Sequence, residues 1–312
     1  MSCPLTNVGA CLALFALAVP AEAREGAPRE SQKQAAKDQT VLLRWKVPEG
    51  KAIAFKSFMG PVDPKKDGVL KFNIGKLAEG LGLPAEAREK TFALRLPKSA
   101  SMVSILRGLP NRRLSVKMIV TQVAVPPPSG SKMEDLMADM MRRMQGTVQL
   151  RGEITDAGEV SSFYLQSRQK NLLAMLFQLP KERVKVGDSW QLDVNLLEMG
   201  HGFICEKASR TNRATLVSLS DTEDGDTLAA IDYCIAESVE GKFMMPMSDK
   251  TQPCSMATSF VGRGEFLAKR GTWKRLAARM RTKATGMMSS DADQHMGLEP
   301  LAKVPAKLLK LE

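Results

Sequence analysis

Apolar and polar residues alternate along much of the chain, which is typical of strands that bury one face of a sheet. Turn-forming clusters such as Pro48-Glu49-Gly50 and Asp156-Ala157-Gly158 separate these segments, as expected for hairpins. In the first half of the chain the pattern predicts strands at Val41–Val47, around Ile53 and Phe55, and at Leu114–Val125, Val148–Ile154 and Val160–Leu165.

The second half of the chain shows more of the same pattern. Val184–Val186 and Trp190–Leu196 flank a Gly187-Asp188 pair, which predicts a hairpin with a tight turn. Further strands are predicted at Arg213–Ser220, Thr227–Glu237, Ser259–Phe266, Thr272–Leu276 and Arg279–Met287.

Two segments carry helical periodicity instead. After the Pro-rich stretch 126–131, Ser131 and Glu134 have the spacing of a capping box, and Gly146 marks the end of the helix. Apolar residues of this helix fall on one stripe, which favours packing against the core; they are Met133, Leu136, Met137, Met140, Met141 and Met144. The apolar segment Leu172–Leu179, stopped by Pro180, predicts a second helix, and short helical stretches are expected between Asn73 and Lys90.

These elements predict a β-rich fold of the α+β class. We expect a large curved antiparallel sheet or half-barrel with two or three short helices. The length of 312 residues is ample for a core. We therefore expect a single domain over residues 40–312, with 126–131 as an internal connector.

The N-terminus has the features of a secretory signal peptide. The apolar run Val8–Val19 precedes Ala21-Glu22-Ala23, an A-x-A cleavage pattern. A twelve-residue helix reaches only about 18 Å, well short of the ~30 Å core of a bilayer. We predict a signal peptide at 1–23, a flexible leader at 24–39, and a soluble periplasmic or extracellular protein without a transmembrane segment.

The cysteines remaining after cleavage are Cys205, Cys234 and Cys254. An oxidising compartment favours one disulfide. If the strands around residues 213–237 form a hairpin, paired positions sum to about 447, so that Cys234 faces Arg213. The same ladder puts Cys205 near Lys242, close to the loop that carries Cys254. We predict a Cys205–Cys254 disulfide and a free, half-buried Cys234.

The sequence Gly187-Asp188-Ser189-Trp190 is similar to the first block of GDSL-type esterases, whose serine is the nucleophile. Such a serine needs a base within hydrogen-bond reach. The Asp-x-x-His spacing of those enzymes is missing near the C-terminus, where Asp291-Ala292-Asp293-Gln294-His295 stands instead. A turn that enters a strand explains the block better, and the expected protein is not an enzyme. A serine esterase using Ser189 is the first alternative.

The longer block from Leu179 to Trp190, with Val-Gly-Asp-Ser-Trp at its end, resembles a block of uncharacterised exported bacterial proteins that form a domain family of unknown function. The resemblance extends to Ala284-Thr285-Gly286-Met287 and implies no catalytic residues. The expected architecture also resembles the half-barrels of lipoprotein carriers. That likeness implies an apolar concavity.

The residue types of the chain give little support for a metal site or a cofactor site. Only two histidines, His201 and His295, are present. The acidic stretch 221–226 is expected to be a hairpin loop, since it lacks the spacing of an EF-hand. The 19 methionines leave a Cu(I)-handling protein as the second alternative. The residues concerned are Met137, Met140, Met141 and Met144 on the helix, and Met244, Met245, Met247 and Met256 around Cys254. Core packing of the methionines is the preferred interpretation, so no metal and no cofactor are expected.

Positive charge is concentrated near the C-terminus. The segment from Gly262 to Lys283 holds eight cations against the single acid Glu265. They are Arg263, Lys269, Arg270, Lys274, Arg275, Arg279, Arg281 and Lys283. Strict alternation places the cations of Arg279–Thr285 on one sheet face. Cleavage after Ala23 removes one acid and no lysine or arginine, and so raises the net charge from +11 to +12.

We therefore expect this basic face to bind polyanions weakly and in a salt-dependent way. Aromatic residues make up only 5% of the chain, which argues against nucleic acid because stacking platforms are scarce. The sequence predicts an exported, non-catalytic binding or envelope-associated protein. Its expected partners are anionic lipids or polymers of the envelope, or an apolar ligand.

Overall fold

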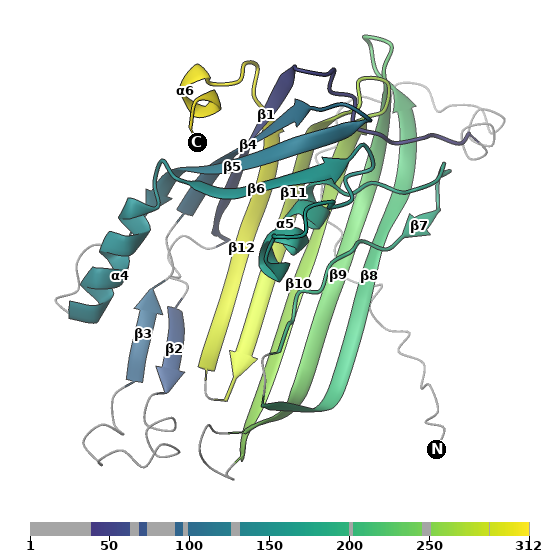
Figure 1. Ribbon diagram of the computed structural model, residues 1–312. Helices are drawn as coiled ribbons and strands as arrows, with labels where there is room; N and C mark the ends of the chain where they lie inside the picture. Colours follow the sequence, from purple (N-terminus) through teal and green to yellow (C-terminus); the bar gives the residue numbers. More distant parts are fainter. Residues whose placement is uncertain are drawn as a thin grey trace, which may run out of the picture.

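The structure is a computed structural model that describes residues 39–62, 69–73, 91–95, 99–125, 132–199, 202–244, 251–286 and 288–311. The described chain is β-rich, with one large antiparallel sheet that does not close on itself, and with three helices (Figure 1). The predicted signal peptide, nearly all of the leader, the connector 126–131 and the region 74–90 lie outside the described residues. In the part of the chain that is described, no helix is long and apolar enough to cross a membrane.

Ten strands form the main path of the sheet, in the order β6-β5-β4-β1-β12-β11-β10-β9-β8-β7, and β2 and β3 extend from the end of β12. The strands of the first half are β1 (Ala52–Pro61), β2 (Val69–Asn73), β3 (Thr91–Arg95), β4 (Ser99–Gly108), β5 (Arg113–Ala124), β6 (Val148–Thr155) and β7 (Ser189–Trp190). The long strands that follow are β8 (Phe203–Asp221), β9 (Thr227–Met244), β10 (Thr251–Leu267), β11 (Thr272–Thr285) and β12 (Met288–Pro300). The helices are α4 (Lys132–Arg143), α5 (Ser167–Phe177) and α6 (Ala306–Leu309).

Helix α5 packs on one face of the sheet, here called the inner face (Figure 1). Its last five residues, Leu173–Phe177, are all buried. They join one apolar cluster with inner-face side chains of the sheet, such as Phe55, Phe260 and Leu298, each of which is 0% exposed. The apolar C-terminal half of α5 therefore forms the centre of the core.

Two tryptophans fix the C-terminal end of α5 to the sheet. The indole Nε1 of Trp45 donates to the carbonyl of Phe177 at 2.7 Å, and that of Trp273 donates to the carbonyl of Leu176 at 2.8 Å. The last carbonyls of a helix have no partner within the helix, so these bonds satisfy groups that burial would otherwise leave unpaired. The two rings also pack edge to face, with centroids 6.2 Å apart.

The C-terminal segment covers part of the opposite, outer face. Leu301, Val304, Leu308 and Leu311 pack on a small cluster formed by β1, β4 and β5. Lys117 on β5 donates to the carbonyl of Leu311 at 2.5 Å. The outer face is therefore covered by the chain's own end at β1, β4 and β5.

Several predicted strands are confirmed, some of them with longer bounds. The predicted strand Leu114–Val125 is β5, and Val148–Ile154 is β6. The two strands predicted at Thr272–Leu276 and Arg279–Met287 form one continuous strand, β11. The predicted helix Leu172–Leu179 is α5, which begins at Ser167, and the methionine-rich helix is α4, followed by Gly146 at φ 82°.

Three strand predictions are wrong. Residues 41–47 are extended and alternate in burial as expected, but their amides bond to Val184, Asp156 and Gly271 in three separate places, so they form no ladder. Val160–Leu165 makes only one isolated bridge, between Val160 and Ile154. The hairpin around Gly187 is absent because β7 pairs with β8 instead.

Candidate functional site

The Gly-Asp-Ser block forms the predicted turn. Gly187 adopts φ 98°, and the Asp188 carboxylate accepts a hydrogen bond from the amide of Lys185 at 2.9 Å, which closes the turn. The hydroxyl of Ser189 lies 2.8 Å from that of Thr215, and Trp190 packs against the core. His295 lies on the outer face of β12, five strands away, and His201 is outside the described residues. The block is therefore a turn that leads into strand β7. Among the described residues, no histidine is placed to act as a base for Ser189.

The predicted anion-binding residues gather at the β10–β11 hairpin. The outer face carries Arg263, Arg275, Arg279, Arg281 and Lys283, with Lys274 beside a β-bulge at Glu265/Phe266. Lys269 and Arg270 lie at the hairpin tip. The alternation in the sequence thus placed Arg279, Arg281 and Lys283 correctly on one face of β11.

Acids from neighbouring strands lie between these cations. Arg279 makes two hydrogen bonds to Asp293 of β12, and Arg263 makes two to Asp232 of β9. These bonds hold the pKa of Asp293 below its usual value and raise the pKa of both arginines. Arg281 approaches Asp291 to 3.7 Å.

Glu265 forms ion pairs with two more of the cations. Arg275 donates to its carboxylate at 2.5 Å and Lys274 lies 3.6 Å away, and the bond to Arg275 is the main reason that the pKa of Glu265 is lowered. Exposed ion pairs contribute little to stability. Their consequence here is a smaller net positive charge on this face than the sequence segment suggests. Binding of polyanions to this face stays a prediction.

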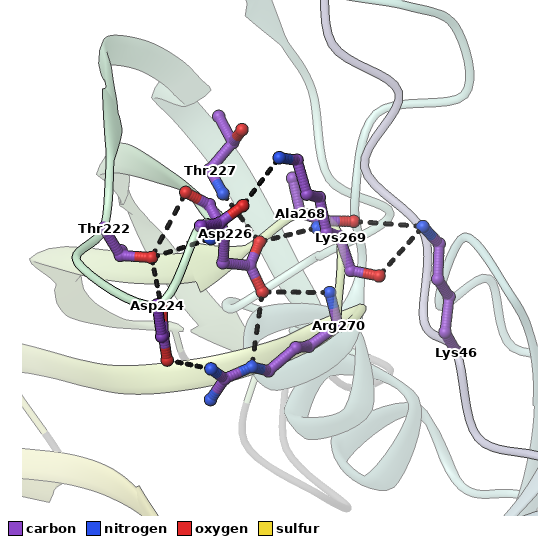
Figure 2. A network of polar contacts seen from close by, with 9 residues as sticks. Lys46, Thr222, Asp224, Asp226, Thr227, Ala268, Lys269 and Arg270 are labelled. Carbon is purple, nitrogen blue, oxygen red and sulfur yellow. Dashed lines mark hydrogen bonds and ion pairs between the residues drawn. The ribbon is translucent and has the colours of Figure 1, made fainter.

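The acidic loop between β8 and β9 is bonded to the next hairpin (Figure 2). Asp226 is 3% exposed, and its carboxylate accepts from the amides of Thr227, Lys269 and Arg270 at 2.7, 2.8 and 3.1 Å. The guanidinium of Arg270 lies 3.5 Å from Asp226 and also donates to Asp224. These carboxylate oxygens therefore connect two hairpins. In the described part of the chain, no group of three or more histidines, cysteines or acids could hold a metal ion.

Asp226→Ala is expected to lower the free energy of unfolding by about 2–3 kcal/mol, because it leaves buried amides without an acceptor. Glu223→Ala is the matched control, since Glu223 is exposed in the same loop and should be nearly neutral. Urea unfolding measures both. A rise in thermal stability on adding calcium that disappears in Asp226→Ala would contradict the structural role.

The predicted disulfide is not formed, and Cys205, Cys234 and Cys254 are free thiols. The register Arg213↔Cys234 is as expected, but a bulge after Cys205 pairs it with Gly241 instead of Lys242. Cys254 pairs with Gly241 from the other side, so the two thiols flank β9. Two strand spacings separate their Cα atoms by about 10 Å, which exceeds the ~7 Å limit of a disulfide.

Helix α4 does not bury its apolar stripe as predicted. Leu136, Met140 and Met144 are 55%, 54% and 43% exposed. The interpretation of this stripe as a core contact is therefore wrong for these three side chains. In the second methionine group, Met244 is 47% exposed, Met256 lies on the inner face, and Met245 and Met247 lie outside the described residues.

The inner face changes character along the long strands. On β9, Ile235 is 0% exposed, but Val239, four residues further on the same face, is only half-buried. The same change occurs on β10 from Phe260 (0%) to Met256. Strand β10 spans 17 residues, about 55 Å, while the eleven residues of α5 span about 16 Å. Helix α5 therefore covers only part of the inner face.

Among the described residues, the part beyond α5 is mainly apolar, and it is here called the open inner face. Its half-buried side chains include the apolar Met59, Val239, Phe243, Met256 and Met280 and the polar Gln252, Thr282 and Gln294. Small buried residues of β11 and β12, among them Ala284, Ser290 and Ala292, lie on the same face. Sequence alternation predicted these faces, but not where the cover ends.

A carboxylate marks the boundary between the covered and the open parts. Glu237 is 6% exposed and accepts a hydrogen bond from the amide of Leu197 at 2.8 Å. Arg210 lies 3.2 Å from the other oxygen, which is an ion-pair distance without hydrogen-bond alignment. Arg210 therefore offsets the charge of this buried carboxylate at the boundary.

A hollow of about 460 Å³ lies between the segment Leu42–Pro48 and the β4–β5 turn. Arg112 and Arg113 lie at its edge, and Arg113 pairs with Glu153 at 3.0 Å. Asn111 and Arg112 have φ near 60°, as a two-residue type I′ hairpin requires. Turn formation explains this region, so the open inner face is the stronger candidate.

No known family model and no curated protein matches this chain. The candidate site is therefore defined by its own geometry.

Proposed function

We propose that the protein is an exported, non-catalytic binding protein that holds an apolar ligand, such as the acyl chain of a lipid, on the open inner face. In this proposal the sheet forms a half-barrel that resembles those of lipoprotein carriers, within an α+β fold. The signal-peptide pattern at residues 1–23 supports export, and the Leu179–Trp190 block supports a relation to exported proteins of unknown function.

The observation that carries the proposal is the half-buried apolar surface on strands whose inner side chains are fully buried under α5. Met256 and Met280 are on the same face as Phe260 and Leu276, which are 0% and 1% exposed. Contiguous apolar surface on a soluble protein commonly marks a binding site. Methionine suits such a surface because its flexible side chain adapts to ligands of varied shape.

The neighbouring residues favour binding over catalysis. The side chains of the open inner face are mostly apolar and offer a few polar groups, such as the Thr282 hydroxyl, which lies 3.1 Å from that of Thr258, and the Gln294 amide. Ligand sites of this type are mostly apolar, with a few polar groups that set orientation. The Glu237–Arg210 pair at the boundary is the charged group closest to that role.

The double variant Met256→Asp/Met280→Asp is expected to weaken binding of a fluorescent apolar probe, N-phenyl-1-naphthylamine, by about tenfold or more, because each charge would have to be buried under the ligand. Fluorescence titration of the purified protein measures the probe. Displacement by fatty acids and by phospholipids then tells these two sources of an acyl chain apart.

Val261→Asp is the matched control, because Val261 is 51% exposed on the outer face of the same strand as Met256. It should bind the probe as the parent protein does. Equal loss in Val261→Asp, or no saturable probe binding by the parent protein, would contradict the proposal.

A further inference from the structure

The segment between β6 and α5 presents two adjacent aromatic side chains to solvent. Phe163 is 98% exposed and Tyr164 is 74% exposed. The chain contains few aromatic residues, and among the described residues seven of them are buried in the core. Exposing two neighbouring aromatic rings costs hydration free energy, so this feature calls for a partner.

The two rings are held outward by anchored neighbours. On one side, the Ser162 hydroxyl accepts from the amide of Glu153 at 2.7 Å, and the amide of Ser161 donates to the Glu153 carbonyl at 2.9 Å. On the other side, Leu165 is 7% exposed and belongs to the main core. The backbone is thus fixed along β6, and the aromatic pair between these anchors cannot turn inward without breaking them.

Positive charge lies next to the aromatic pair. Arg168 is exposed and Lys170 half-exposed on the first turns of α5, and the segment 160–171 contains no acid. In the described part of the chain, neither cation has an ion-pair partner. Acids of the adjoining strand and turn are already paired, Glu153 with Arg113 at 3.0 Å and Glu159 with Lys181 at 2.5 Å.

We propose that the Phe163–Tyr164 pair inserts into the interface of an anionic lipid bilayer, while Arg168 and Lys170 contact the headgroups. Aromatic side chains favour the boundary between headgroups and acyl chains, where the ring is apolar and a tyrosine hydroxyl stays hydrated. Cations beside them add attraction to anionic lipid. Both rings project into solvent from an anchored backbone, which fits a planar surface. The Phe163–Tyr164 pair lies outside the open inner face, so this proposal does not depend on the apolar ligand proposed for that face.

The test is co-sedimentation with vesicles of phosphatidylcholine containing a minority of phosphatidylglycerol, using protein without residues 1–23, whose apolar run would itself bind lipid. Phe163→Ser/Tyr164→Ser is expected to lower the partition coefficient by about tenfold or more, since the buried ring area is lost. Arg168→Gln/Lys170→Gln should lower it by about tenfold on these vesicles and leave binding to pure phosphatidylcholine unchanged.

Val261→Ser removes an exposed apolar side chain elsewhere and should bind vesicles normally. The triple variant Arg279→Gln/Arg281→Gln/Lys283→Gln measures separately the contribution predicted for the basic outer face. As a second measurement, the Phe163→Trp variant should show a blue shift of its indole emission on adding vesicles and quenching by brominated lipid. Normal binding by the double serine variant, or an emission of the Phe163→Trp variant that vesicles do not shift, would overturn the proposal whatever the triple variant does.

Discussion

Trp273→Ala is expected to lower the free energy of unfolding by about 4 kcal/mol, among the largest effects that one substitution can have here. Trp273 is 1% exposed, and its ring packs edge to face on Phe266 with centroids 5.1 Å apart. Its removal would leave a large cavity under α5 and leave the carbonyl of Leu176 unpaired. Both losses act at the end of the helix that forms the centre of the core. Urea unfolding followed by circular dichroism measures the effect.

Two controls separate the parts of this effect. Trp273→Phe keeps most of the ring but removes the donor, and should cost about 1–3 kcal/mol. Trp190→Ala removes a half-buried tryptophan whose buried Nε1 has no hydrogen-bond partner in the described structure, and should cost less than Trp273→Ala. A loss of under about 1 kcal/mol in Trp273→Ala would show that α5 is not anchored there.

Local alternation identified most strands because it reports directly on a sheet with one covered face. It succeeded on β9, whose burial alternates strictly over Thr227–Ser238. It failed at residues 41–47, which alternate in the same way. There, the inward side chains Leu43 and Trp45 pack in the core, but the backbone amides of the segment donate hydrogen bonds to separate parts of the chain. Burial can therefore be predicted from alternation, and pairing cannot.

Strand β12 was not predicted because both of its faces carry polar or small residues in the region Ser289–His295. Its inner positions, Ser290 and Ala292, are small enough to pack without an apolar pattern. Its outer positions, Asp291 and Asp293, pair with arginines of β11. In this region, cross-strand ion pairs take the place of an apolar pattern. Such pairs depend on which strands are neighbours, so the sequence of one strand does not reveal them. For the same reason, the sequence segment 262–283 overstated the net charge of the basic face.

Exposure of apolar side chains was the least predictable feature of the site. The period of α4 shows that the helix is amphipathic, but not whether its stripe is covered. Phe163 fits the alternation of a strand, yet no strand forms, and the ring is 98% exposed. Likewise, the inner face of β10 continues past α5, from Phe260 to Met256, without a break in the strand. The extent to which another segment covers a sheet face depends on residues far away in the sequence. A local pattern of apolar and polar residues does not report it.

Gly158→Ala is expected to lower the free energy of unfolding by more than about 3 kcal/mol, because it combines backbone strain with a steric clash. Gly158 has φ 77° in the turn after β6, a conformation that favours glycine. A Cβ atom there would lie 1.9 Å from the carbonyl oxygen of Phe177, the last residue of α5. That oxygen accepts the bond from Trp45, so relieving the clash would move the helix end away from its anchor.

Gly146→Ala is the matched control, since Gly146 has φ 82° but nothing lies within 4 Å of its added Cβ. It should cost only the backbone term of about 1–2 kcal/mol. Urea unfolding of the two variants therefore isolates the contact between the turn and α5. If Gly158→Ala is no more destabilising than Gly146→Ala, the close approach to Phe177 is not a constraint on the fold, and α5 can move without loss of stability.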